Sequence, residues 1–219
     1  MIWQFPATIV FLSLIPSALI SIIAFRKEPG ENLNKALYVK LLIWGAISVL
    51  PGIILVSIGT GLVGRGILSD FILRPFLSTA LIEESIKLTV IILILYRDEN
   101  FRTINDGIRY SIAVAVGFAF AENIIYLTGS SNPVPMIISR SLTAVPLHAI
   151  CGAFMGYFAG KGKIEEKRFY SKTLATTVII HGFYNILINL HYPYYLLSII
   201  LLLVALFFLR GQVMKKSHQ

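Results

Sequence analysis

Two adjacent glutamates, Glu83 and Glu84, lie in the middle of an apolar stretch long enough to cross a membrane, roughly Phe71 to Tyr96. An ionised carboxylate at the centre of a bilayer costs at least ~2.5 kcal/mol, and charged residues at this depth usually pair or serve a function. The pair therefore indicates either a buried structural ion pair or a functional site inside the membrane.

The composition is typical of an integral membrane protein. Of the 219 residues, 56% are hydrophobic and only 14% are charged, whereas soluble domains carry about 25% charged residues. Since a spanning helix takes ~20 apolar residues, the sequence predicts an all-α, polytopic fold with about seven transmembrane helices. The apolar segments are approximately Trp3–Phe25, Ala36–Ile58, Phe71–Tyr96, Gly107–Thr128, Pro135–Ala159, Thr173–Leu190 and Pro193–Leu209.

Residues 1–219 are predicted to form a single membrane-embedded domain, because no stretch between the apolar segments is long enough for a soluble core. The first segment lacks a basic region before it and is too long for a signal peptide, so we expect a retained helix. The segment Gly59–Gly66 contains four glycines and is predicted to be a loop.

The net charge of +8 is explained by the predicted membrane topology and not by a nucleic-acid-binding surface. Fifteen of the 19 basic residues fall on one side, in alternate loops and at the C-terminal end. Only Arg65, Arg74 and Arg140 fall on the other side, and Lys87 lies inside a helix. The positive-inside rule then predicts an N-terminus outside the cell and a C-terminus in the cytoplasm.

Polar residues recur at a similar depth in the later apolar segments. On a helix, Lys87 is within one turn of both Glu83 and Glu84 and can neutralise either. Arg140 either snorkels to the interface or pairs with a glutamate. Each of these groups, taken alone, is also consistent with a hydrogen-bonded residue that serves only helix packing.

The predicted depths of these polar groups along their helices nevertheless place them close together in the bilayer. At ~1.5 Å per residue from the predicted helix ends, they fall in the middle or outer half of the bilayer, between the third and sixth helices. The candidate catalytic residues are Glu83, Glu84, Glu122, His148 and His181, with Lys87, Asn123, Arg140 and Asn185 in supporting positions. A separate series of glycines, Gly152, Gly156 and Gly160, favours close helix packing.

Carboxylates and imidazoles in one site fit two chemistries. One is base-assisted activation of water, and the other is zinc coordination. Because no HExxH pair occurs, zinc held by Glu122, His148 and His181 is the alternative. A proton- or cation-coupled transporter or channel also lines its cavity with such residues, although the sequence shows no inverted repeat.

Four short motifs on successive segments resemble the PrsW family of intramembrane proteases, within the wider group of CAAX-processing membrane peptidases. The family pattern is EExxK, FxxxEN, HxxxG and HxxxD. It is matched by Glu83-Glu84-x-x-Lys87, Phe118-x-x-x-Glu122-Asn123, His148-x-x-x-Gly152 and His181-x-x-x-Asn185. The resemblance covers a motif-bearing core from about residue 71 to 190. Asn185 departs from the acid of the PrsW pattern, but peptidases of the wider group carry Asn there.

The resemblance implies an intramembrane peptidase of the prokaryotic plasma membrane. Its substrate would be a single-span membrane protein such as an anti-sigma factor, cut at the outer side of the bilayer. A CAAX-type prenyl protease and a zinc-dependent membrane peptidase are the alternatives within this group. At the fourth motif, Asn185 is expected to orient His181 or the substrate carbonyl.

In the resulting mechanism, Glu83 or Glu84, together with Glu122, holds and deprotonates the attacking water without a cofactor. His148 or His181 stabilises the oxyanion or protonates the leaving amine.

Overall fold

The fold consists of helices packed into a bundle. The computed structural model describes residues 4–25, 33–167, 170–190 and 196–216, and this part contains no strand. The elements are α1 (Gln4–Ala24), α2 (Lys35–Ile47), α3 (Val49–Val63), the π-helix η1 (Ser69–Ala80), α4 (Leu81–Val90), the π-helix η2 (Ile91–Leu95), α5 (Ile104–Thr128), α6 (Pro133–Leu142), α7 (Ala144–Ile164), α8 (Tyr170–Ile188) and α9 (Leu197–Lys216). The prediction of an all-α fold is confirmed.

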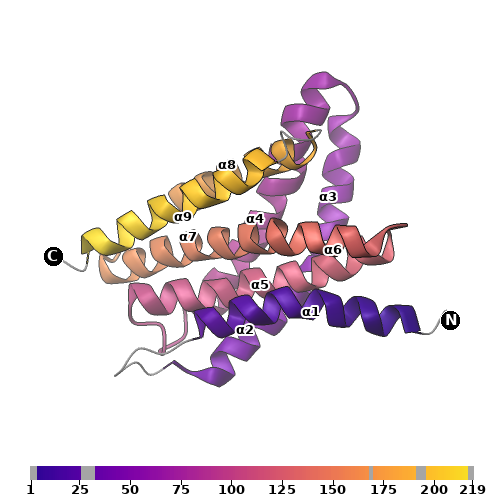
Figure 1. The fold of residues 1–219 in the computed structure, drawn as a ribbon. Helices are drawn as coiled ribbons and strands as arrows, with labels where there is room; N and C mark the ends of the chain where they lie inside the picture. Colours follow the sequence, from indigo (N-terminus) through magenta and orange to yellow (C-terminus); the bar gives the residue numbers. More distant parts are fainter. Residues whose placement is uncertain (1–3, 26–32, 168–169, 191–195, 217–219) are drawn as a thin grey trace.

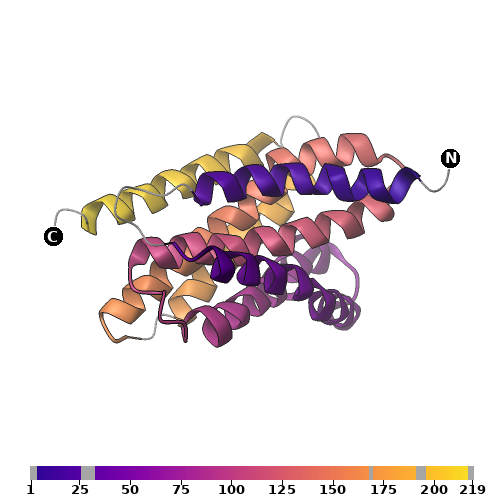
Figure 2. The ribbon, with the colours of Figure 1, turned by 90° about the horizontal axis from the view of Figure 1, so that it is seen from below.

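Helices α5 and α7 form the centre of the bundle and run side by side (Figures 1 and 2). Their backbones come close because glycines face each other. A Cβ atom on Gly156 would collide with the backbone of Gly107, and one on Gly152 would lie 2.6 Å from the Cβ of Ala115. The close packing that the glycine series predicted is thus confirmed. Helices α1 and α2 also pack on α5.

Two of the predicted continuous helices are broken, each four residues before a proline. A proline has no backbone N–H, and its ring clashes with the carbonyl four residues earlier. The ring of Pro146 is directed at the carbonyl of the last residue of α6. Thr143, between α6 and α7, has a non-helical backbone, with a φ of −128° and a ψ of −62°. Pro51 acts likewise on Ile47, the last residue of α2. The predicted helix 135–159 is therefore two helices.

The third apolar segment stays helical from η1 through α4 to η2. Its first part, η1, packs against α3 and α8 and projects from the bundle with α3 (Figure 1, top). The predicted loop Gly59–Gly66 is wrong in its first half, because α3 continues to Val63. Gly59 faces η1 and the start of α4, where an added Cβ would lie 3.4 Å from Ser78 Cα and 3.1 Å from Ile82 Cδ1. The chain turns at Gly64, which has a φ of +71° that glycine adopts without strain.

Within the residues that the structure describes, four helical stretches are long and apolar enough to cross a membrane: Ala7–Ala24, Lys35–Val63, Ile104–Thr128 and Pro133–Ile164. The chain is therefore a polytopic membrane protein, and the count of seven spans stays a prediction. Residues 69–95 form a continuous helical stretch, but its ionisable side chains lower its hydropathy. Parts of the first and last predicted segments, at Trp3 and 193–195, lie outside the described residues.

Candidate active site

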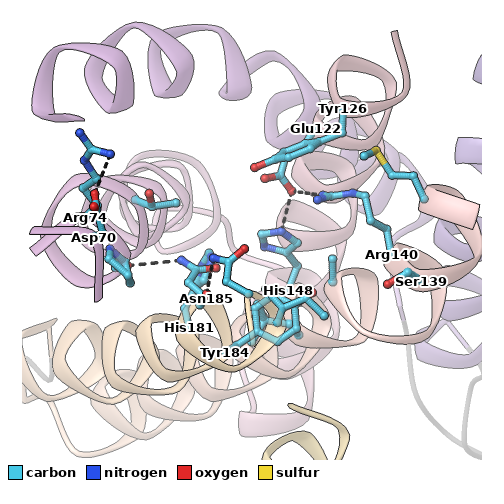
Figure 3. A pocket seen from close by; sticks show the side chains of 17 residues that line it. Asp70, Arg74, Glu122, Tyr126, Ser139, Arg140, His148, His181, Tyr184 and Asn185 are labelled. Carbon is cyan, nitrogen blue, oxygen red and sulfur yellow. Dashed lines mark hydrogen bonds and ion pairs between the residues drawn. The ribbon is translucent and has the colours of Figure 1, made fainter. Parts of the chain in front are cut away.

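A cavity of ≈ 580 Å³ opens between η1, α8 and the α5–α6–α7 side of the bundle (Figure 3). Its walls carry charged and amide side chains from helices that are far apart in the sequence. The lining residues are Asp70, Arg74, Pro75 and Thr79 of η1, Glu122 and Tyr126 of α5, Met136, Ser139 and Arg140 of α6, Ala144, Leu147 and His148 of α7, His181, Tyr184, Asn185 and Ile188 of α8, and Asn189 directly after α8.

One carboxylate of the site, Glu84, is completely buried and paired with a cation. The side chain of Lys87, one turn later on α4, donates to Glu84 Oε1. The same oxygen lies 2.7 Å from His181 Nδ1. Because Glu84 and Lys87 have exposed side-chain fractions of 0% and 1%, neither charge is compensated by solvent. Glu84 therefore holds both Lys87 and one edge of the His181 ring.

A second carboxylate, Glu122, forms a separate ion pair. Its Oε2 atom accepts a hydrogen bond from Arg140 Nη2 at 2.7 Å and lies 2.9 Å from His148 Nε2. Figure 3 shows Glu122 between these two partners. The Arg140 side chain also donates from Nε to Asn123 Oδ1 at 2.6 Å. Of the two fates predicted for Arg140, the structure has the pairing with a glutamate.

Lys87 connects the two ion pairs. Its Nζ atom lies 3.0 Å from His148 Nδ1, and a charged lysine only donates hydrogen bonds. A neutral His148 ring therefore accepts at Nδ1 and carries its proton on Nε2, directed at Glu122. The rings of His148 and His181 stand nearly perpendicular, with centroids 5.4 Å apart. The structure thus joins four of the five candidate catalytic residues, Glu84, Glu122, His148 and His181, in one hydrogen-bonded network from α4, α5, α7 and α8.

Glu83 is the carboxylate of the site that forms no ion pair with a lysine or arginine among the residues that the structure describes. Its side chain is buried, and its Oε2 atom has no hydrogen-bond partner among the described residues. The nearest imidazole atom, His181 Nε2, lies 3.9 Å away, beyond hydrogen-bond distance. Glu84 Oε2 likewise has no hydrogen-bond partner among these residues, so Glu83 differs from the other two glutamates in forming no ion pair with a lysine or arginine there.

Some positions differ from what the sequence indicated. Asn185 does not bond His181 but donates from Nδ2 to the carbonyl of Pro75 at 3.3 Å, which ties α8 to η1. Sequence reasoning missed Tyr184, whose hydroxyl lies 2.9 Å from Thr143 Oγ1 at the start of α7. The spacing of three residues between His181 and Tyr184 was the available signal. Sequence reasoning also missed Asp70, which lines the cavity from η1.

The comparisons with known proteins agree with this geometry. The family model of the PrsW family intramembrane metalloprotease matches residues 34–210. The chain belongs to the PrsW family. Protease PrsW of Geobacillus kaustophilus is 32% identical over 164 residues, which cover 74% of this chain and 71% of the relative. Protease PrsW of Halalkalibacterium halodurans is 26% identical and covers 92% of this chain and 93% of the relative. No solved structure matches the chain.

Membership of the PrsW family confirms the resemblance that the four motifs indicated. It also decides between a protease and a transporter in favour of an intramembrane protease. The catalytic roles of the individual residues stay predictions.

The description of the PrsW family implies a metal, and the donor set in the site fits one. Glu83, His148 and His181 each offer a ligand atom within 4.8 Å of the others. Two imidazoles and a carboxylate are a common zinc set, and a carboxylate behind a ligating histidine, as Glu84 stands behind His181, is typical of such sites. This cluster contains Glu83 where the zinc alternative placed Glu122. Both nitrogens of His148 already contact Lys87 and Glu122, so a metal there would replace one contact.

Proposed function

We propose that this intramembrane protease activates water with Glu83 and cleaves a single-span membrane protein in its cavity. The observation that carries the proposal is the division of charges among the three glutamates. Glu84 pairs with Lys87 and Glu122 pairs with Arg140, whereas Glu83 forms no ion pair with a lysine or arginine in the described part of the chain, and its Oε2 has no hydrogen-bond partner there. A general base must have a free oxygen within reach of the water proton, directly or through one water.

The remaining residues hold the reacting groups in place. A water between Glu83 Oε2 and His181 Nε2, which are 3.9 Å apart, contacts both. Glu83 accepts a proton from this water while the water oxygen attacks the peptide carbonyl. His148, held at both nitrogens by Lys87 and Glu122, would stabilise the resulting oxyanion through its Nε2–H, shared between Glu122 and the oxyanion. The proton on Glu83 then passes to the leaving amine, and the peptide bond breaks.

The metal form of the proposal uses the same three side chains. Glu83, His148 and His181 would hold a zinc ion, which supplies Lewis acidity and a bound water with a lowered pKa. In that form Glu84 would fix the His181 ring from behind, because it contacts Nδ1 at 2.7 Å. The metal form predicts that a chelator abolishes cleavage, and the metal-free form predicts that a chelator leaves cleavage unchanged.

The proposed substrate is a single-span protein, in the first place an anti-sigma factor. A helix that unwinds in lipid exposes backbone N–H and C=O groups, and each unsatisfied group costs several kcal/mol. The cavity wall offers hydrogen-bonding side chains for such a segment, among them Ser139, Asn185 and Asn189. A prenylated CAAX peptide is the second candidate substrate, which the Asn185 of the fourth motif favours.

The test is cleavage by purified protein in phosphatidylethanolamine and phosphatidylglycerol liposomes, with a tagged single-span anti-sigma factor as substrate. We expect Glu83→Gln to lose ~10²–10⁴-fold in rate, since glutamine keeps the size but not the basicity of glutamate. Glu99→Gln is the matched control, because Glu99 is exposed in the loop after η2.

Near-normal cleavage by folded Glu83→Gln would contradict the proposal. Loss of activity with a chelator and its return with zinc would favour the metal form. Cleavage of a prenylated CAAX peptide in place of the anti-sigma factor would contradict the proposed substrate.

A further inference from the structure

We propose that Arg140 is a positioning residue, which acts through Glu122 to hold the His148 imidazole in its working orientation. The proposal rests on the proposed function, in which His148 contacts the reacting peptide. Arg140 itself would contact neither the water nor the scissile bond.

The Arg140 guanidinium is held by three residues of α5. It donates to Glu122 at 2.7 Å and to Asn123 at 2.6 Å, and it lies 4.0 Å from the centroid of the Tyr126 ring. A planar guanidinium presents its donors in a fixed geometry, so partners at several of its atoms restrain the carboxylate oxygen that it binds. Only 14% of the Arg140 side chain is exposed. With two of its donor nitrogens already bonded within the protein, Arg140 is better suited to hold Glu122 than to bind a substrate.

The oxygen that Arg140 binds is the one that faces His148. Glu122 Oε2 accepts from Arg140 and lies 2.9 Å from His148 Nε2. On the opposite edge of the ring, Lys87 lies 3.0 Å from Nδ1. The imidazole is therefore fixed at both nitrogens. Without Arg140, Glu122 would lose the cation that fixes it. Of its contacts among the described residues, the one to His148 would remain, and the two side chains would be able to turn together.

The helix break explains how an α6 residue reaches this position. Arg140 lies in the last turn of α6, and His148 lies in the first turns of α7. Because Pro146 separates the two helices at Thr143, α6 can direct Arg140 at α5 while α7 carries His148 into the cavity.

The first experiment measures His148 without any substrate. Protein labelled with ¹⁵N-histidine is reconstituted into phosphatidylethanolamine and phosphatidylglycerol vesicles, and its ring-nitrogen resonances are recorded by solid-state NMR. The resonances are assigned by their loss in His148→Gln and His181→Gln. In Arg140→Ala we expect the His148 signals to shift and the His181 signals to stay, since Glu84 and not Arg140 holds His181. This result is informative even if the proposed function is wrong.

The second experiment measures cleavage of the tagged anti-sigma factor. We expect Arg140→Ala to lower kcat about 10- to 100-fold, which is typical for loss of a residue that orients an active-site histidine, with KM within about twofold of the original. Arg140→Lys keeps the charge and should recover part of kcat. In a Glu122→Gln background, Arg140→Ala should cost little more, because residues that act as one unit are not additive. Arg65→Ala, in the exposed turn before η1, is the control.

Three results would overturn the proposal. One is an unchanged His148 signal in both Arg140 variants. Another is a rise in KM at constant kcat, which would make Arg140 a substrate-binding residue. The third is a loss in the double variant equal to the product of the two single losses. A wild-type protein that cleaves neither substrate would instead contradict the proposed function, and the NMR result would still decide the role of Arg140.

Discussion

The buried pair of Glu84 and Lys87 makes a stability prediction that can be worked out from the structure. Lys87→Met removes the cation and leaves Glu84 charged, fully buried and with its second oxygen unpaired. Breaking a buried ion pair by removing one partner costs about 3–5 kcal/mol. His181 still contacts Glu84 at 2.7 Å, so we expect a loss near the lower end, about 3 kcal/mol.

Removing both charges should cost less than removing one. The double variant Lys87→Met/Glu84→Gln leaves no uncompensated charge, and neutral replacements of a buried pair are often tolerated. We therefore expect it to recover at least about 2 kcal/mol relative to Lys87→Met, which is within the range of coupling between contacting residues.

The assay is reversible unfolding in mixed detergent and dodecyl sulfate micelles, followed by circular dichroism. Lys40→Met, at an exposed position on α2, is the matched control and should change the free energy of unfolding little. If Lys87→Met were as stable as the control, or if the double variant lost the sum of both single changes, the assignment of a buried charged pair would be refuted.

Two further predictions concern packing and topology. Gly156→Val should destabilise the bundle by about 1–3 kcal/mol or more, because its Cβ would meet the backbone of Gly107; the same assay should show little change for Gly211→Val, which has open space. Cysteines introduced at Arg102 and Glu165 should resist an impermeant thiol reagent in intact cells and react after lysis, since the positive-inside rule places these loops in the cytoplasm. Labelling in intact cells would reverse the predicted orientation.

The sequence determined the class of fold and the residue types of the site. Hydropathy and composition are local properties, so a chain with 56% hydrophobic residues specifies membrane helices without knowledge of their neighbours. The motifs likewise fix which face of each helix carries a polar group, because helical spacing is regular. This was enough to select Glu83, Glu84, Glu122, His148 and His181, of which the structure joins the last four in one network and places Glu83 3.9 Å from His181.

Helix ends and breaks were only partly predictable. The glycines of residues 59–66 suggested a loop, but Gly59 serves the contact between α3 and η1. Its effect depends on a neighbour distant in the sequence, which local propensity does not contain. The prolines that break α2–α3 and α6–α7 were visible, but a proline in a membrane helix is often tolerated.

Only the tertiary structure decided how charges pair inside the bundle. Lys87 is within one helical turn of both Glu83 and Glu84, so spacing alone did not select between them. The choice follows from residues on other helices, because His181 contacts Glu84 and His148 contacts Lys87, whereas Glu83 forms no ion pair with a lysine or arginine among the described residues. Pairing in a low-dielectric interior depends on distances of a few ångströms between helices, and the sequence does not encode these distances locally.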